Sequence, residues 1–458
     1  MKPRALLEVA RAVGGEPVDA DDVRVSSVQT DSRLVGAGAL FVALAGEHAD
    51  GHAFVEDAFG HGATAALVRP GFVVGGPSVL VSDTGQALLD LAADERRAFA
   101  GTVVAITGAN GKTSTKDMAA AVCAERFRTY ASPRSFNNEV GLPMTLLGAP
   151  PDTEVVIAEL GARHVGDVQR LMPIADPSIA VVTNVGVAHM EVFGSWEAIV
   201  EASAEPIEAL GDEDVAILNA DDTVASSFAD RTSARVRSFG RGADAAVRAD
   251  DVSLAPDGCA SFDLVADGQR VRVSLTVPGE HMVHNALAAA AVGLELDVPL
   301  AACASALAAA RITPWRMETT ATPRGVRVVN DAYNANPESV AAALKTARWM
   351  ASDGRLIAVL GQMAELGAIA AEEHERVGEL AARLHVDRLI TIGPEAKAIA
   401  VAGVREGVEP ENVADYDDAD GALTDVLGVA RDGDVVLVKG SRVAGLERLA
   451  ARLVEALS

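Results

Sequence analysis

The stretch VVAITGANGKTSTKD, residues 103–117, has the residue types of a phosphate-binding loop. Gly108 and Gly111 leave backbone N–H groups bare at the start of a predicted helix, whose dipole favours negative charge there. Lys112 would reach terminal phosphates, and the hydroxyl of Thr113 would lie on Mg²⁺. The spacing is the tight Thr-Gly-x-x-Gly-Lys-Thr form, because Ile106 stands where the common loop has a glycine. The predicted nucleotide-binding residues are Thr107, Gly108, Ala109, Asn110, Gly111, Lys112, Thr113 and Ser114.

Two further candidates follow predicted strands. Glu159 closes the apolar run EVVIAEL, and His189 comes just after SIAVVTNV. Parallel sheets bind ligands at the carboxyl ends of their strands, so both side chains should face the phosphate loop. A single histidine is more often a hydrogen-bonded core or surface residue, but this position at a strand end favours a functional role.

The elements that carry these residues predict an α/β protein with three domains. Residues 1–98 combine short strands and turns with a helix, which indicates a small amino-terminal α/β domain. Residues 99–312 alternate apolar strands with helices, as a parallel sheet with crossover helices requires, and residues 234–277 indicate an antiparallel appendage. The proline of ITPWRME marks a boundary, and residues 313–458 alternate again as a Rossmann-like carboxyl-terminal domain.

Composition and net charge exclude several classes of function. The 458 residues are 49% hydrophobic, which is enough for two or three cores, and the formal charge of −26 repels nucleic acid and anionic membranes. The chain has no signal-peptide h-region and no run of 18 apolar residues. We therefore expect a cytoplasmic protein that neither binds nucleic acid nor inserts into a membrane. We also expect it to be a monomer.

The motifs resemble those of the Mur ligases, the ATP-dependent amide ligases of peptidoglycan precursor synthesis. The similar segments span nearly the whole chain: TGANGKTST, SFNNEVGLP, AELGARHVGDV, TNVGVAHMEVFGS, PGEHMVHNALAAAAV, WRME, NDAYNANPESV, GQMAELG and KGSR. Within the family, YNANP and MAELG are similar to members that add D-alanyl-D-alanine to UDP-N-acetylmuramoyl-tripeptide. That chemistry phosphorylates a carboxylate with ATP and lets an amine attack the acyl phosphate, so cations must gather around the γ-phosphate.

The resemblance implies roles for single residues. Lys112, His189 and Arg316 would be catalytic, and Thr113, Glu159 and His189 would hold Mg²⁺. Asn285 would read adenine, Asp331 would accept hydrogen bonds from ribose, and Arg316 would reach the ATP phosphates. The chain departs from the family pattern at Met282 and Asn330, where asparagine and aspartate are usual, and at Trp315, where glycine is usual.

The resemblance also implies where the substrates bind. Ser32 and Arg33 of TDSR, with the Asp50–His52 segment DGH, would cradle the UDP end of the sugar nucleotide. Asn137 and Asn138 would bond its peptide or acyl end. Tyr333, Asn334, Asn336 and Glu365 would read the incoming dipeptide.

One departure concerns a metal ligand. Ser203 falls where most family members carry a lysine that CO₂ carbamylates, and serine cannot form that carbamate. On a regular helix Glu201 and Glu205 point away from Ser203, although a break at Pro206 could re-aim Glu205 as a substitute ligand.

Three other functions compete with this interpretation. A sister ligase would add a single amino acid to the dipeptide precursor. With a diamino acid, that reaction would call for an Asp-Asn-Pro-Arg signature, which the last domain lacks. A folylpolyglutamate synthase would fit the loop but not TDSR or YNANP. A nucleotide-dependent binding protein without ligase activity stays open.

Overall fold

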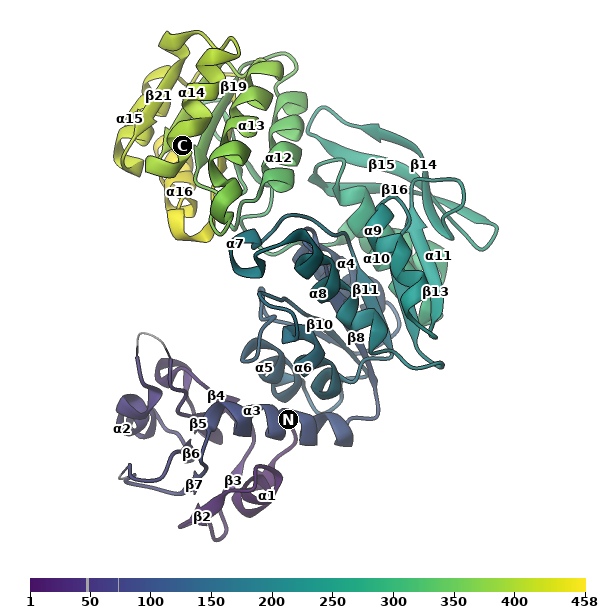
Figure 1. The fold of residues 1–458 in the computed structure, drawn as a ribbon, viewed down its shortest axis with the longest axis vertical. Coiled ribbons are helices and arrows are strands. Elements are labelled where there is room, and N and C mark those ends of the chain that lie inside the picture. Colours follow the sequence, from purple (N-terminus) through teal and green to yellow (C-terminus); the bar gives the residue numbers. More distant parts are fainter. Residues whose placement is uncertain (47–48, 73) are drawn as a thin grey trace.

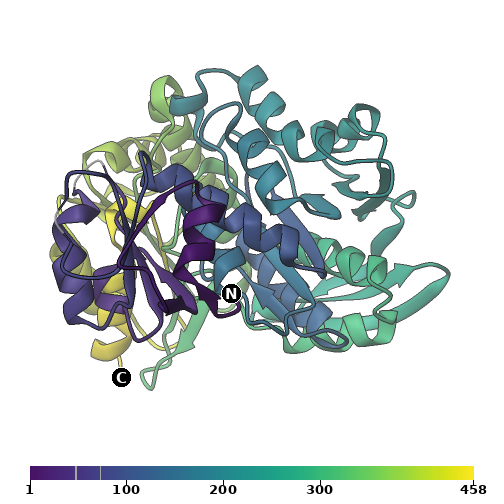
Figure 2. The same cartoon turned by 90° about the horizontal axis from the view of Figure 1, so that it is seen from below.

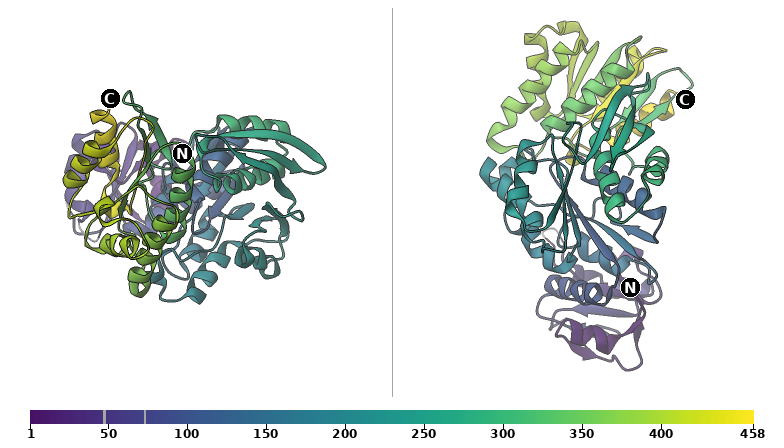
Figure 3. Two further views of the ribbon diagram at one scale, coloured as in Figure 1. Left: turned by 90° about the horizontal axis from the view of Figure 1, so that it is seen from above. Right: turned by 90° about the vertical axis from the view of Figure 1, so that its right-hand side faces the viewer.

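Three large β-sheets follow one another along the chain, and a fourth sheet of two strands accompanies the first. The computed structural model describes residues 1–46, 49–72 and 74–458 (Figure 1). The amino-terminal and carboxyl-terminal parts lie at opposite ends of the long axis, with the central part between them (Figures 1 and 3). Seen from below, both end parts are offset to the same side of the central part (Figure 2). The central part therefore faces both of the others.

The first sheet has five strands in the order β2-β7-β6-β5-β4, and only β2 is antiparallel to its neighbour. A two-stranded pair, β1 with β3, stands apart from it. The strands are β1 (Arg4–Ala5), β2 (Glu16–Val18), β3 (Arg24–Val25), β4 (Ser27–Gln29), β5 (Ala39–Val42), β6 (Ala65–Val68) and β7 (Ser78–Leu80). The helices are α1 (Leu6–Ala12), α2 (Val55–Gly60) and α3 (Thr84–Ala98), and α3 leads into the central part.

The second sheet has nine strands in the order β16-β15-β14-β13-β12-β11-β8-β10-β9. All pairs from β9 to β14 are parallel, and β14, β15 and β16 pair antiparallel. The strands are β8 (Thr102–Thr107), β9 (Thr129–Ala131), β10 (Val155–Glu159), β11 (Ile179–Val182), β12 (Val215–Asn219), β13 (Arg235–Gly240), β14 (Val247–Leu254), β15 (Cys259–Ala266) and β16 (Gln269–Pro278).

The prediction of a separate antiparallel appendage at residues 234–277 was wrong in one respect. β13 pairs parallel with β12, and the antiparallel strands continue the same sheet. The reason is packing: Phe262 and Leu264 on β15 are fully buried in the same apolar cluster as the central strands and the helix over them. Short strands broken by turns are also what an extension at a sheet edge looks like in sequence.

Helices cover both faces of the central sheet because its strands are apolar on both sides. Val104 and Ile106 of β8 pack in one cluster with α4 and α10, while Val103 and Ala105 pack in another with α6 and α8. The helices are α4 (Lys112–Ala124), α5 (Gly141–Gly148), α6 (Asp167–Ala175), α7 (Met190–Phe193), α8 (Trp196–Glu208), α9 (Thr223–Ser227), α10 (Met282–Glu295) and α11 (Leu300–Ala309).

The third sheet has six strands in the order β17-β18-β22-β19-β20-β21, and only β17 is antiparallel. The strands are β17 (Glu318–Ala321), β18 (Arg327–Asn330), β19 (Leu356–Gly361), β20 (Arg388–Ile392), β21 (Val413–Tyr416) and β22 (Val435–Lys439). The helices are α12 (Pro337–Met350), α13 (Ala370–Arg383), α14 (Lys397–Arg405), α15 (Ala419–Val429) and α16 (Glu447–Ala456). Within the described ranges, no helix has both the length and the apolar character needed to cross a bilayer.

The carboxyl-terminal part contacts the central part at several places, two of which lie far apart. One is the phosphate loop. The other is the turn between β14 and β15, which lies beside α12 (Figure 1). There the indole nitrogen of Trp349 donates to the carbonyl of Ala255 at 2.9 Å, and a Cβ on Gly258 would stand 2.9 Å from Cγ of Met350.

Candidate active site

The phosphate loop links the end of β8 to the start of α4. Gly108 has φ 131° and Gly111 has φ 82°, which L side chains rarely adopt. A Cβ would also stand 2.1 Å from Oγ1 of Thr183 at the first position and 2.3 Å from Oδ1 of Asn285 at the second. The backbone angles and the lack of space for a Cβ both require glycine at these two positions. Without side chains there, the backbone N–H groups of the loop are free to surround an anion.

The loop is tied to the segment after β11. The Asn110 carbonyl accepts hydrogen bonds from Oγ1 of Thr183 at 2.6 Å and from Nδ2 of Asn184 at 3.0 Å. The Asn110 N–H donates to Oδ1 of Asn184 at 2.8 Å. Sequence reasoning missed Asn184 as part of the site, although its place just after a predicted strand was a usable signal. These bonds fix the loop before any ligand binds.

Among the residues that the structure describes, no carboxylate pairs with the Lys112 amine. Its amine donates to the carbonyls of Gly108 at 2.6 Å and Ala109 at 3.3 Å. Burial lowers the pKa of Lys112 below its ordinary value; the carboxylate of Glu159 opposes this shift, and the charge of Arg316 adds to it. Carbonyl oxygens leave its charge unneutralised, so the amine can pair with an incoming anion.

A chain of hydrogen bonds joins the start of α4 to the end of β10. Oγ1 of Thr113 donates to Oε2 of Glu159 at 2.8 Å, and Nδ2 of Asn137 donates to the other carboxylate oxygen at 2.8 Å. Arg316, from beyond the central sheet, donates to Oγ1 of Thr113 at 2.7 Å. Carboxylate and hydroxyl oxygens at the foot of a phosphate loop are the donors that Mg²⁺ prefers.

His189 occupies the position before the first residue of α7 with φ 60°, and it lines the cavity described below. Its Nδ1 contacts Oε2 of Glu365, which belongs to the carboxyl-terminal part. Burial and then the nearby charge of Lys112 lower the pKa of His189, against the effect of Glu365. Across the part of the chain that the structure describes, no three His, Cys, Asp or Glu side chains gather as a metal cluster. A divalent cation here would therefore take further ligands from phosphate and water.

The carboxyl-terminal part closes the site from the other side. The guanidinium of Arg316 stacks on the Tyr333 ring, 4.2 Å from its centroid. Asn336 caps α12 with its Oδ1 and donates from Nδ2 to Oδ1 of Asn110 at 2.8 Å. Asp331 accepts from Nζ of Lys439 at 2.6 Å. Lys439 is the last residue of β22 and belongs to the KGSR motif, whose pattern did not predict a place for it in the site.

One cavity of about 980 Å³ collects nearly all of the predicted residues. It is lined by Thr107, Gly108, Ala109, Asn110, Gly111, Lys112, Thr113, Ser114, Asn137, Asn138, Glu159, His189, Asn285, Arg316, Asp331, Tyr333, Asn334 and Asn336. Two of the side chains have local partners as well. Oδ1 of Asn138 accepts the N–H of Gly141 at the start of α5, and Nδ2 of Asn285 lies 3.4 Å from the sulfur of Met282.

Ser32 and Arg33 are not among the residues that line this cavity. Oγ of Ser32 donates to Asp57 at 2.6 Å, so its proton is already engaged. The side chain of Arg33 is 82% exposed and pairs with Asp31. The two residues lie in the amino-terminal part, where a long ligand would have to extend to meet them.

The idea that Glu205 could substitute as a metal ligand was wrong. α8 runs unbroken through Pro206, and both carboxylate oxygens of Glu205 accept backbone N–H groups at the start of α6, from Gly166 and from Gln169 at 2.8 Å. Glu205 is buried and stabilises that helix start. Ser203 lines the cavity.

This chain belongs to the Mur ligase family. Three family models match it in order along the chain: the Mur ligase family catalytic domain at residues 24–88, the Mur ligase middle domain at 106–293, and the Mur ligase glutamate ligase domain at 315–442.

Individual relatives are similar over almost their whole length. The UDP-N-acetylmuramoyl-tripeptide–D-alanyl-D-alanine ligase of Mycobacterium tuberculosis is 41% identical, with 98% of this chain and 97% of the relative covered. The enzyme of that name from Bacillus subtilis is 34% identical, with 94% and 93% covered.

Among solved structures, MurF from Acinetobacter baumannii has a TM-score of 0.89 at 29% identity, with 99% of each chain covered. MurF ligase from Thermotoga maritima in complex with ADP has a TM-score of 0.82 at 28% identity, with 94% of this chain and 98% of that chain covered. The predicted family and the three-domain α/β class are thereby confirmed.

Proposed function

We propose that this chain is an ATP-dependent, ADP-forming ligase that adds D-alanyl-D-alanine to UDP-N-acetylmuramoyl-tripeptide in peptidoglycan precursor synthesis. The observation that carries the proposal is the single cavity in which the phosphate loop meets Glu159, His189 and the YNANP residues of the carboxyl-terminal part. Relatives aligned over nearly the full chain bear the name of that ligase. ATP supplies the phosphoryl group that turns the tripeptide carboxylate into an acyl phosphate.

The chain's residues divide this work. Lys112 and Arg316, which pair with no carboxylate of the described residues, would pair with the transferring phosphoryl group. Thr113 and Glu159 would hold Mg²⁺ beside the nucleotide, and His189 would hold a second Mg²⁺ together with phosphate oxygens and water. Mg²⁺ supplies charge neutralisation, which lets two anions approach. Because Ser203 cannot be carbamylated, this second site works without a carbamate ligand.

The remaining cavity residues bind substrate. Asn285 reads adenine and Asp331 the ribose. Asn137 and Asn138 hold the acyl end of the tripeptide, and Tyr333, Asn334 and Asn336 face the incoming dipeptide. Ser32 and Arg33, with the segment 50–52, bind the UDP end, so the sugar nucleotide spans from the amino-terminal domain to the cavity.

We further propose that the domains are residues 1–98 for UDP-sugar, 99–312 for ATP and 313–458 for the dipeptide. The protein acts as a monomer in the cytoplasm. Closure of the domains on their ligands follows from ATP contacts on both sides of residue 313, since Arg316 and Asp331 lie beyond it.

An amine screen tests the function. The chain is incubated with ATP, UDP-N-acetylmuramoyl-tripeptide and one amine at a time, and phosphate release and product mass are recorded. Phosphate should appear only when tripeptide and D-alanyl-D-alanine are both present, with a product heavier by the dipeptide less water. Turnover with a single amino acid and the dipeptide precursor would indicate the sister ligase. Nucleotide binding without turnover on any pair would indicate a binding protein.

A further inference from the structure

Glu365 of the carboxyl-terminal domain contacts both the loop after β10 and the loop after β11. Its Oε2 meets Nδ1 of His189, and its Oε1 accepts a hydrogen bond from Arg163. Its backbone carbonyl accepts the N–H of Glu191 at 3.0 Å. One residue thus makes three polar contacts across the domain boundary.

The loop that carries Glu365 is seated tightly on α7. Glu365 itself has φ 62°, a left-handed conformation that is unusual outside glycine. Two residues on, Gly367 has φ 55°, and a Cβ there would stand 3.0 Å from Cα of Glu191. The backbone accepts this conformation because the surrounding contacts fix it, which places the carboxylate beside the imidazole.

The contact decides which ring nitrogen of His189 is free. A carboxylate beside Nδ1 accepts a hydrogen bond, so the neutral ring carries its proton on Nδ1 and its free lone pair on Nε2. A histidine that binds a metal through one nitrogen usually donates the other N–H to a carboxylate or carbonyl, which fixes both tautomer and orientation. Arg163 on the second oxygen keeps Glu365 charged and in place.

Glu365 does not line the cavity, although His189 does. Both of its carboxylate oxygens already have partners, His189 and Arg163, so the side chain is poorly placed to bind a dipeptide directly. Since Glu365 and His189 come from different domains, the contact exists only when the two domains are together.

We propose that Glu365 is a positioning residue that orients His189 for the second divalent cation when the carboxyl-terminal domain closes. The proposal rests on the function proposed above, in which His189 is a cation ligand. It replaces the expectation that Glu365 reads the incoming dipeptide. Domain closure then completes the cation site as well as delivering the amine.

Mn²⁺ binding to the full chain with ADP, measured by electron paramagnetic resonance, tests this without turnover. Glu365→Ala should weaken Mn²⁺ binding about 10- to 100-fold, as removal of the outer partner of a ligating histidine does. Glu365→Gly should behave alike, and it suits the left-handed backbone, so a folding defect cannot account for the loss. Glu372→Gln, which removes one exposed carboxylate of the same domain, is the matched control and should bind Mn²⁺ normally.

Two further measurements separate positioning from other roles. In a His189→Ala background, Glu365→Gly should cause no additional loss, because the effect passes through the imidazole. Nitrogen NMR of the His189 ring should show protonated Nδ1 in the parent chain and a tautomer mixture in Glu365→Gly. Kinetically, kcat should fall while KM for D-alanyl-D-alanine holds.

Unchanged Mn²⁺ affinity and tautomer, together with a raised KM for the dipeptide, would overturn the proposal. An equal loss of Mn²⁺ affinity with and without His189 would overturn it too. If the chain proves to use another amine, the Mn²⁺ and NMR results still decide the role of Glu365, so the two failures are distinguishable.

Discussion

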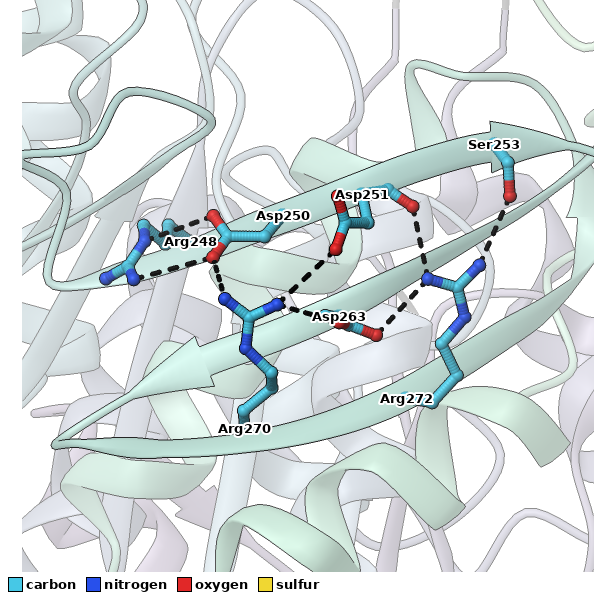
Figure 4. Close-up of polar contacts among 7 residues, drawn as sticks. All are labelled: Arg248, Asp250, Asp251, Ser253, Asp263, Arg270 and Arg272. Carbon is cyan, nitrogen blue, oxygen red and sulfur yellow. Dashed lines mark hydrogen bonds and ion pairs between the residues drawn. The ribbon is translucent and has the colours of Figure 1, made fainter.

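Two regions of this molecule hold arginine and lysine in opposite ways. On the outer face of β14, β15 and β16, three arginines and three aspartates pair with one another (Figure 4). Arg270 donates to Asp250 at 2.6 Å and to Asp263 at 2.8 Å, and Arg272 donates to Asp263 at 3.2 Å. Every charge in this network has an opposite charge beside it.

In the cavity, the cations nearest the phosphate loop have neutral partners. Lys112 donates to loop carbonyls, and Arg316 donates to the Thr113 hydroxyl and stacks on Tyr333. A cation in a partly buried site without an opposite charge is costly unless an anion arrives. Paired charges on the outer sheet face therefore stabilise the protein surface. Cations without an opposite charge indicate where a polyphosphate binds, even in a chain of net charge −26.

The largest effect should come from Lys112→Ala. Removing the amine takes away a preorganised charge on the transferring phosphoryl group, so ligase turnover should fall by several orders of magnitude. The melting temperature should hold, because the amine bonds only to loop carbonyls. Lys345→Ala, an exposed lysine on α12, is the control and should leave turnover unchanged. Near-normal turnover in Lys112→Ala would contradict the phosphate-loop assignment.

A several-fold effect is expected at Asn336, which has two separable tasks. Asn336→Asp keeps an acceptor for the start of α12 but sets a carboxylate against Oδ1 of Asn110. Stability should hold while KM for ATP rises several-fold. Asn336→Ala should additionally lose about 1 kcal/mol of unfolding free energy with the cap. Equal KM values for Asn336→Asp and the parent chain would show that this interdomain bond does not matter for nucleotide binding.

A small effect is expected in the outer network. Arg270 and then Arg272 hold the pKa of Asp263 below its ordinary value of 3.8, so their pairing stabilises the fold above that pH and is lost as pH falls through the lower, folded-state value. The double variant Arg270→Ala/Arg272→Ala should have a slightly lower melting temperature at pH 7, and its turnover should be unchanged. Thermal melts at a series of pH values should show the difference vanishing in acid. A difference that grew below pH 4 would have the wrong sign.

No effect is expected when bicarbonate is withdrawn. Ser203 lines the cavity but cannot form a carbamate, so the initial rate at slightly acid pH should be indifferent to CO₂. Ser203→Ala should behave like the parent chain in the same assay. A reversible loss of rate on removing CO₂ would show that a lysine elsewhere carries the modification.

Sequence alone predicted the features that depend on local pattern. The apolar runs at 102–107, 155–159, 179–182 and 215–219 are parallel strands, and the glycines at 108 and 111 stand where the backbone requires them. These follow from the apolar alternation and from the conformational freedom of glycine, which nearby residues determine.

The rest depended on contacts between distant segments. Glu205 looked available as a ligand because no local rule shows that the start of α6 takes both of its oxygens. β13 looked like part of an appendage because its partner, β12, is recognised only in three dimensions. Lys439 and Asn184 meet the site from strand ends that pattern reasoning located without placing side by side.

The turn between β14 and β15 has a mechanical consequence. It contacts Trp349 and Met350 of the carboxyl-terminal domain, while the linker before that domain is tied to α4 by the Thr313 N–H, which donates to Asp117 at 2.7 Å. If these two contacts persist while those of Asn336 and Glu365 break, the carboxyl-terminal domain rotates about the line that joins them. This rotation would move Asn336 and Glu365 together, either toward the phosphate loop or away from it.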